Sequence, residues 1–413
     1  MGLVYDEVCR LTIKKISNEP VSVMKNLIVF FYIDALNSSF LTSDTMPFLS
    51  SLAKKHSCCE LENVLGYSFA IQSCMLSGKY PEETNHWLPY FYSPRESPIL
   101  FRTLNKVGAV FPIDRFSAVR HLMVDQIRRF LLKEGVRTNN VPLTMIDKLA
   151  LYPYYYMCEL PFFNELKELL DKKCQASLTY MGPPKLKKHL YGSLLKYIRA
   201  SKYENELIIA YDDALDGLGH RFGPYSTECL DYANSLDRLL FRVYEKLEKR
   251  FGKSLTFLVF SDHGQCRRAH SLDLLSELQR KALHFAEDYL CFVDATMALF
   301  WPQSVLVKEK ILNILHEMKI GKVVDEDLRE RYHIKFNDAR FGEIIFVLKP
   351  GGTFFPNFFS PFSAMRGLHG YFPEDEVQKG FLISSKQFSY QPKHVKDLRN
   401  LLLEVSSYPF GRT

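Results

Sequence analysis

Long apolar runs are missing from this chain of 413 residues. A membrane-spanning helix needs about eighteen consecutive apolar residues, and no run approaches that length, so the sequence predicts no membrane span. Residues 1–20 also lack an apolar segment, and we therefore expect no secretory signal. Asp6 breaks the pattern for N-myristoylation after Gly2.

A regular cysteine framework is also absent. The chain has nine cysteines, with Cys58 and Cys59 adjacent and no C-x-x-C pair. This pattern is typical of reduced thiols and not of a disulfide scaffold. It favours a cytoplasmic location.

Neither charge sign is in strong excess, and the net charge of +6 is small for the length. A polymeric nucleic acid is therefore not the expected partner. Hydrophobic residues make up 47% and charged residues 24% of the chain, which is ordinary for a globular protein. No internal repeat or low-complexity linker divides the sequence.

Three short apolar runs come before acidic residues. Asn26–Ile33 precedes Asp34, Leu207–Tyr211 precedes Asp216, and Leu255–Phe260 precedes Asp262. Runs of this length and composition are typical of strands buried on both faces of a parallel sheet. Ligands of open α/β sheets gather at the carboxyl ends of the strands, so we expect these three carboxylates to meet in one crevice.

Histidines accompany two of these carboxylates. Asp216 and His220 are four residues apart with glycines between them, a spacing that suits zinc or manganese, although by itself such a pair is more often incidental. The adjacent Asp262 and His263 form a stronger signal because they directly follow a predicted buried strand. His369 is a lone histidine between glycines and carries little weight alone.

The runs that bear these residues favour an α/β fold, a three-layer αβα sandwich with a mostly parallel central sheet. We expect one catalytic domain over 1–413 with two insertions. Residues 96–200 form the first, which is helix-rich at 118–134 and 162–173 and is expected to shape the substrate pocket. Residues 280–340 form the second.

Five motifs together resemble the alkaline phosphatase superfamily, and most closely its type I phosphodiesterase and nucleotide pyrophosphatase branch. In chain order they are Y-I-D-A-L-N around Asp34, Y-S-F-A-I-Q-S-C-M-L-S-G-K-Y-P-E-E around Ser68, L-D-G-L-G-H-R-F-G-P at 215–224, S-D-H-G at 261–264 and L-H-G-Y at 368–371. The resemblance implies an alkaline-phosphatase-like fold.

The resemblance also implies a site for two divalent metal ions, zinc first and manganese second. Asp216, His220 and His369 would hold one ion. The other would be held by Asp34, Asp262 and His263, with Ser68 completing its shell. Ser68 is then the nucleophile, which attacks phosphorus and forms a phosphoseryl intermediate that water hydrolyses.

Several positions depart from the family pattern. Most of the branch has threonine where this chain has Ser68, and the family's Thr-Phe-Pro-Asn appears as Ser-Phe-Ala-Ile. A phosphate-binding asparagine of the family is missing near Pro89, where Asn85 and His86 are the candidate substitutes. A sulfatase is disfavoured because C/S-x-P-x-R is absent, and a monoesterase is disfavoured because Lys79 is the sole cation of the segment. A diester is the expected substrate.

Aromatic residues follow the nucleophile segment. Trp87 and Tyr90 are candidates for stacking on a base or lining a lipid groove, although a plain aromatic core is the more common explanation. With Lys79 and Asn85 they complete the candidate substrate-binding set.

The leading hypothesis is a metal-dependent hydrolase of phosphodiester or pyrophosphate bonds, acting on a small-molecule or lipid-linked phosphoester. One alternative is a phosphotransferase that passes the group to a glycan or lipid hydroxyl. The other is a catalytically silent metal-binding protein. The basic stretch at 185–202 has helical spacing and fits either a surface helix packed on its own domain or peripheral contact with a membrane.

Overall fold

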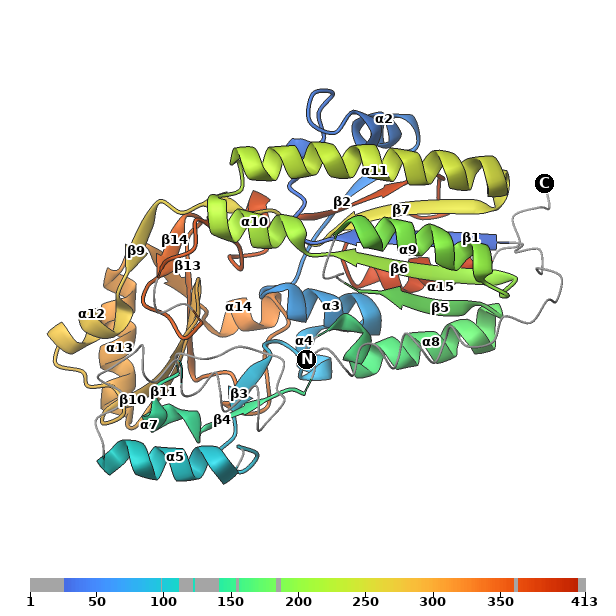
Figure 1. Ribbon diagram of the computed structural model, residues 1–413. Coiled ribbons are helices and arrows are strands. Elements are labelled where there is room, and N and C mark those ends of the chain that lie inside the picture. Colours follow the sequence, from blue (N-terminus) through green and yellow to red (C-terminus); the bar gives the residue numbers. More distant parts are fainter. Residues whose placement is uncertain are drawn as a thin grey trace.

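The computed structural model describes residues 26–97, 99–110, 122, 141–153, 156–182, 187–359 and 363–407. Its main sheet has six strands in the order β2-β16-β7-β1-β6-β5 (Figure 1). The strands are β2 (Ser57–Leu61), β16 (Gly380–Ser384), β7 (Leu255–Ser261), β1 (Asn26–Ile33), β6 (Asn205–Asp212) and β5 (Ser177–Met181). The last four run parallel, and β16 runs antiparallel to both of its neighbours. The expected mostly parallel central sheet is confirmed.

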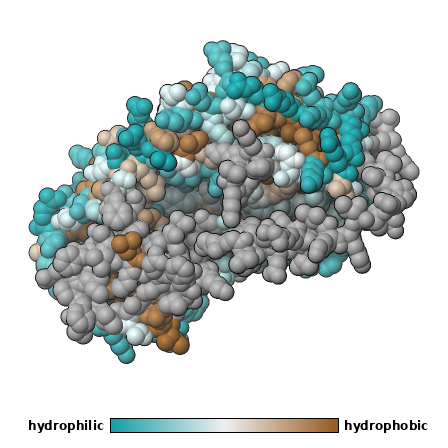
Figure 2. Space-filling view, in the orientation of Figure 1, coloured by the Kyte–Doolittle hydropathy of each residue, from teal (hydrophilic) through white to brown (hydrophobic). Residues whose placement is uncertain are grey.

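Helices cover both faces of this sheet. One face carries α2 (Pro47–Lys55), α9 (Lys187–Ala200), α10 (Ala214–Phe222) and α11 (Thr227–Phe251), and the other carries α3 (Ser68–Ser77), α8 (Pro161–Cys174) and α15 (Asp397–Ser407). Side chains alternate along β1, so that Val29 packs toward the first set of helices and Phe30 toward the second. This arrangement is a three-layer sandwich. In Figure 2 hydrophilic residues line the edge where α11 lies.

A second sheet lies at the other end of the molecule (Figure 1). It contains β10 (Tyr289–Val293), β11 (Met297–Pro302), β13 (Ile344–Leu348) and β12 (Gly321–Val323), and every pairing is antiparallel. Nearby helices are α12 (Leu274–Arg280), α13 (Val305–Glu317) and α14 (Glu326–Arg331). Residues 280–340 thus form most of a sheet with helices, and its buried residues belong to the same cluster as α3 and α8.

The insertion predicted at 96–200 includes residues that the structure places in the central sandwich. Its C-terminal part, with α8, β5 and α9, belongs to the central sandwich. Its N-terminal part contains α5 (Ile99–Val110), α7 (Leu143–Ile146) and β4 (Leu149–Leu151), and β4 pairs with β3 (Tyr90–Tyr92). The helix expected at 118–134 lies outside the described residues, Leu122 excepted.

The remaining elements are short. They are α4 (Pro81–Thr84), β8 (Cys266–Arg267), β9 (His270–Leu272), β14 (Gly352–Phe354), β15 (Gly367–Leu368) and 3-10 turns at Ser38–Phe40, Met157–Glu159, Gly252–Ser254 and Glu376–Gln378. Among the described residues, no helix combines the length and the apolar character that crossing a membrane requires.

Candidate active site

The carboxyl ends of β1 and β7 place two of the predicted acids side by side. Asp34 directly follows β1, Asp262 directly follows β7, and the two strands are neighbours in register. The sequence predicted that Asp216 follows a strand end as Asp34 and Asp262 do, but Asp216 does not directly follow β6. Asp212 is the last residue of β6, and Asp216 lies in the first turn of α10.

Asp34, Asp262 and His263 form a first group whose ligand atoms all lie within 4.8 Å of one another. His263 Nε2 is 3.6 Å from Asp34 Oδ1 and 3.3 Å from Asp262 Oδ2. Ser68 Oγ lies 3.1 Å from the same nitrogen. The structure therefore brings the predicted nucleophile to the edge of this group.

Asp216, His220 and His369 form a second group within the same limit. Asp216 Oδ1 is 3.1 Å from His220 Nε2 and 3.5 Å from His369 Nε2. The rings of His263 and His369 stack with their centroids 3.9 Å apart and an interplanar angle of 15°. The two groups therefore adjoin, and all seven predicted residues meet in one place.

Burial and mutual charge set the electrostatics of the site. Burial, followed by the charges of Asp262 and Asp216, raises the pKa of Asp34 well above its ordinary value. Burial also opposes ionisation of Asp216, but its pKa is lowered because His220, His369 and His263 favour the carboxylate. Burial lowers the pKa of His369, and His263 adds to that effect. Neutral imidazole, the form that binds metals, is thus favoured at His369.

The residues of both groups fit divalent cations. Asp34 Oδ1 is buried and has no hydrogen-bond partner within the described part of the chain, although Tyr211 donates to Asp34 Oδ2. A buried carboxylate oxygen without a partner costs free energy unless a cation meets it. Carboxylate and imidazole together are ligands that zinc prefers.

Neighbouring groups hold the ligands in place. Tyr32 Oη donates to Asp262 Oδ2 at 2.8 Å, and the backbone N–H of Ala35 donates to Asp262 Oδ1 at 3.2 Å. His220 Nδ1 lies 2.9 Å from the carbonyl of Gly367, and His263 Nδ1 lies 3.0 Å from that of Gly264. These contacts leave Nε2 of each ring to face the carboxylates.

The sequence reasoning missed two tyrosines of this supporting shell. Tyr32 and Tyr211 are paired in register on β1 and β6, and each donates to an acid of the first group. The signal that could have found them is a tyrosine at the next-to-last position of each strand, after a run of apolar residues.

Helix α3 presents Ser68 at its N-terminus. Tyr67 is the N-cap residue, and Gly78 ends the helix in the left-handed conformation with φ of 68°. The positive end of the helix dipole therefore lies beside the hydroxyl, where it favours a phosphate group. Tyr67 Oη lies 2.9 Å from Thr296 Oγ1, which anchors this start point to the second sheet.

The four residues predicted to bind substrate do not contact the two metal groups in any described interaction. Trp87 is fully buried and donates from Nε1 to the carbonyl of Leu65 at 2.6 Å, so it belongs to the core. Tyr90 is also buried, and its hydroxyl donates to Asp294 at 2.5 Å. The prediction that Trp87 and Tyr90 stack on a substrate is therefore wrong.

Lys79 and Asn85 are both exposed. Lys79 follows the C-terminal end of α3, which is roughly 15 Å from Ser68 at 1.5 Å per residue, so it cannot contact a phosphate there. Asn85 ends α4 in the left-handed conformation. No described contact joins Asn85 to the metal groups.

The partly exposed aromatic rings of this region differ from those predicted. Phe69 follows Ser68, and its ring stacks on Tyr152 with centroids 5.7 Å apart. His86 stacks on Tyr152 at 4.5 Å. All three side chains are partly exposed. Together they form a small, partly exposed aromatic surface that begins at the residue after Ser68.

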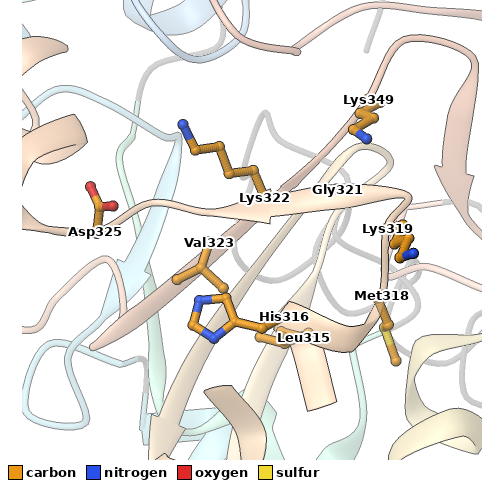
Figure 3. Close-up of a pocket in the computed structure, with 9 residues that line it drawn as sticks. All are labelled: Leu315, His316, Met318, Lys319, Gly321, Lys322, Val323, Asp325 and Lys349. Carbon is orange, nitrogen blue, oxygen red and sulfur yellow. The ribbon is translucent and has the colours of Figure 1, made fainter. Parts of the chain in front are cut away.

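A cavity of about 370 Å³ lies elsewhere, beside α13 and β12. Figure 3 shows that Lys319, Lys322 and Lys349 are among its lining residues. It shares no residue with the two metal groups, so it is separate from the candidate active site.

Helix α9 contains most of the basic stretch at 185–202, for which the sequence allowed either a packed surface helix or contact with a membrane. Leu190, Leu194 and Ile198 are buried in the cluster on its face of the main sheet. Tyr191 Oη donates to Asp212 at 3.1 Å. The described part of this stretch is a helix packed on its own domain.

Solved structures with the same fold include human ectonucleotide pyrophosphatase/phosphodiesterase 5, with a TM-score of 0.61 and 16% identity over 92% of this chain and 94% of that chain. An inactive murine form of the same enzyme in complex with AMP has a TM-score of 0.62 and 15% identity over 94% and 97% of the two chains. These likenesses confirm the alkaline-phosphatase-like α/β fold. No curated protein is significantly similar to the chain in sequence.

The profile of the family "type I phosphodiesterase / nucleotide pyrophosphatase" matches residues 28–372. The chain therefore belongs to this family, and it is a hydrolase of phosphoric esters.

Proposed function

We propose that this chain hydrolyses a phosphodiester or pyrophosphate bond of a nucleotide through a covalent intermediate on Ser68, at a site that holds two divalent cations. The observation that carries the proposal is the 3.1 Å approach of Ser68 Oγ to His263 Nε2, within the group of Asp34, Asp262 and His263 and beside the second group. The complex of the murine neighbour with AMP supports a nucleotide substrate.

Asp34, Asp262 and His263 would hold one cation, and Asp216, His220 and His369 the other. When bound, two such cations lower the pKa of hydroxyl groups and neutralise the charge of a phosphoryl group. The donor sets of carboxylate oxygen and imidazole nitrogen favour zinc, with manganese second.

The chain's own residues supply the nucleophile and its orientation. Ser68 releases its hydroxyl proton to water, and its Oγ forms a bond to phosphorus while the bond to the leaving oxygen breaks. The leaving oxygen takes up a proton from water. A water molecule then loses a proton to the solvent and attacks phosphorus while the bond between phosphorus and Ser68 Oγ breaks. Ser68 Oγ takes up a proton, which restores the hydroxyl group. The N-terminus of α3 favours the negative phosphoryl group throughout.

The aromatic surface of Phe69, His86 and Tyr152 supports a planar leaving or retained group on the substrate. Phe69 follows Ser68 in the chain, Phe69 and His86 both stack on Tyr152, and all three rings are partly exposed. A nucleobase stacked on aromatic rings gains about 1–3 kcal/mol.

Hydrolysis of a p-nitrophenyl phosphodiester and of the matching monoester, with zinc or manganese added, tests the proposal. Ser68→Ala should lower the diester rate by about a thousandfold or more, because the nucleophile is lost. Ser68→Thr is the matched control, since it keeps a hydroxyl and should keep measurable activity.

Equal diester rates in wild type and Ser68→Ala would overturn the proposal. Turnover that requires an added glycan or lipid alcohol would replace it with a phosphotransferase. Metal binding in the expected ratio without turnover of either ester would replace it with a metal-binding protein that is catalytically silent.

A further inference from the structure

Gln265 is a buried amide in contact with one of the candidate metal ligands. It lies two residues after His263, on the loop that follows β7, and is 2% exposed. Its Nε2 lies 2.7 Å from Asp216 Oδ1 and 3.2 Å from the backbone carbonyl of Asp216. One amide group therefore donates to the side chain and to the main chain of the same residue.

The carboxylate oxygen that Gln265 contacts is the one that faces the histidines. Asp216 Oδ1 is 3.1 Å from His220 Nε2 and 3.5 Å from His369 Nε2. A carboxylate oxygen has two lone pairs, so it can accept from an amide and still bind a cation. The hydrogen bond from the Gln265 amide fixes the rotation of the Asp216 carboxylate and keeps Oδ1 facing the two histidines of its group.

Two glycines make room for the amide. A Cβ on Gly219 would lie 2.0 Å from Gln265 Oε1, and a Cβ on Gly367 would lie 2.3 Å from the same atom. By contrast, a Cβ on Gly217, in the same helix α10, would meet nothing within 4 Å. The glycine at 219 is thus required by the position of Gln265, whereas the glycine at 217 is not.

The loop that carries Gln265 is itself held in place. Asn37 Nδ2 donates to the carbonyl of Gln265 at 3.3 Å. The side-chain amide of Gln265 therefore connects the loop of His263, which belongs to the first group, with Asp216 of the second group.

We propose that Gln265 is a positioning residue that sets the affinity of the Asp216, His220 and His369 group for its cation. The proposal rests on the proposed function, since it takes that group to be a metal site. Hydrogen bonds that orient a metal ligand typically change metal affinity about 10- to 100-fold.

The test is a zinc titration of metal-stripped protein against a chromophoric chelator, with cobalt absorption as a second readout. Gln265→Met removes the donor and keeps the length of the side chain. Gly219→Ala keeps Gln265 and displaces its amide. Gly217→Ala is the matched control, because it makes the same change in the same helix where there is space.

Gln265→Met and Gly219→Ala should each weaken the binding of one of the two zinc ions by about 10- to 100-fold and leave the binding of the other unchanged. Gly217→Ala should bind both ions as the wild type does. The cobalt spectrum should change in the first two variants alone. Wild-type affinity for both ions in Gln265→Met would overturn the inference.

Asp216→Asn separates this inference from the proposed function. Loss of one zinc ion in Asp216→Asn, combined with wild-type binding in Gln265→Met, would reject the role of Gln265 and leave the metal site standing. Unchanged zinc stoichiometry in Asp216→Asn would instead reject the metal site and the inference with it. Circular dichroism of the metal-free variants identifies any that fail to fold, and Gly219→Ala then carries the test.

Discussion

Asp34 shows most clearly how single residues point to cations in this site. One of its oxygens accepts from Tyr211, and the other is buried without a hydrogen-bond partner among the described residues. Asp262 lies in the same group, so two carboxylates share one buried space. Charges arranged in this way repel one another, and the folded protein tolerates them best when a cation is bound.

Removal of divalent cations with a chelator should therefore lower the melting temperature of the wild type. A ligand that binds the folded state alone stabilises it by about 4 kcal/mol at a thousandfold excess over Kd. Asp34→Asn should respond less, because a ligand of the first group is lost. Differential scanning calorimetry with and without zinc measures both. An identical melting temperature in the presence and absence of zinc would contradict this account.

The same carboxyl predicts a pH dependence in the metal-free protein. Burial raises the pKa of Asp34 in the folded state, so the folded protein retains this proton to higher pH than the unfolded chain does. Its contribution to stability is then present at low pH and lost as the pH rises from about 4 through the folded pKa. Metal-free Asp34→Asn should thus gain stability over metal-free wild type as pH rises. Denaturant melts across this range would show it, and a constant difference would speak against it.

At the scale of elements, the turn between β10 and β11 reaches from the second sheet into the active site. Thr296 Oγ1 lies 3.0 Å and 2.9 Å from the carbonyls of His369 and Gly370, and it also contacts Tyr67 Oη. One hydroxyl therefore touches the start of the nucleophile helix and the loop of a metal ligand. The second sheet helps to set the spacing between Ser68 and His369.

Thr296→Val should remove these contacts while keeping the volume of the side chain. We expect a loss of about 1–3 kcal/mol in unfolding free energy and a fall in diester hydrolysis. Thr353→Val is the matched control, since Thr353 is also buried and its hydroxyl donates to the carbonyl of Ala295 and not to that of His369. It should lose stability but keep its rate. Equal loss of activity in both variants would show that the contact is merely structural.

The sequence predicted the strand-end acids better than it predicted the elements around them. β1 and β7 are short runs followed directly by their acids, so the position of Asp34 and Asp262 could be predicted from local pattern. Asp216 could not be placed in this way, because β6 ends at Asp212 and α10 begins two residues later at Ala214, so Asp216 lies within the helix. The second sheet was missed because its strands alternate with helices and carry no candidate ligand.

Aromatic residues were the least predictable part of the site. Trp87 and Tyr90 follow the nucleophile segment just as closely as His86, yet they are buried while His86 is partly exposed. Which ring faces the site depends on packing against residues far away in sequence, such as Phe341 on Trp87. Local spacing does not contain that information.

At the scale of the whole molecule, one buried cluster joins the two sheets. Leu258 of the main sheet and Phe346 of the second sheet both belong to it, and Trp87 packs against Phe336 and Phe341. The described residues of the two sheets therefore share a continuous core, and the single catalytic domain over 1–413 stays a prediction. The cysteines of the described part are all free thiols, and the cytoplasmic location stays a prediction.

A continuous core predicts one cooperative unfolding transition. The chain has two tryptophans, and Trp87 and Trp301 are both buried, the second on β11. Tryptophan fluorescence and far-ultraviolet circular dichroism should therefore report the same midpoint in urea. Two separated midpoints would indicate that the second sheet unfolds on its own.

We propose that the phosphoryl group is transferred first to Ser68 and then to water. Each in-line displacement inverts the configuration at phosphorus, so two displacements in sequence retain it. Hydrolysis of a phosphorothioate diester of defined configuration in isotopically labelled water measures this outcome directly. The account predicts net retention. Net inversion would contradict it, because it would mean that water attacks the substrate without a covalent intermediate on Ser68.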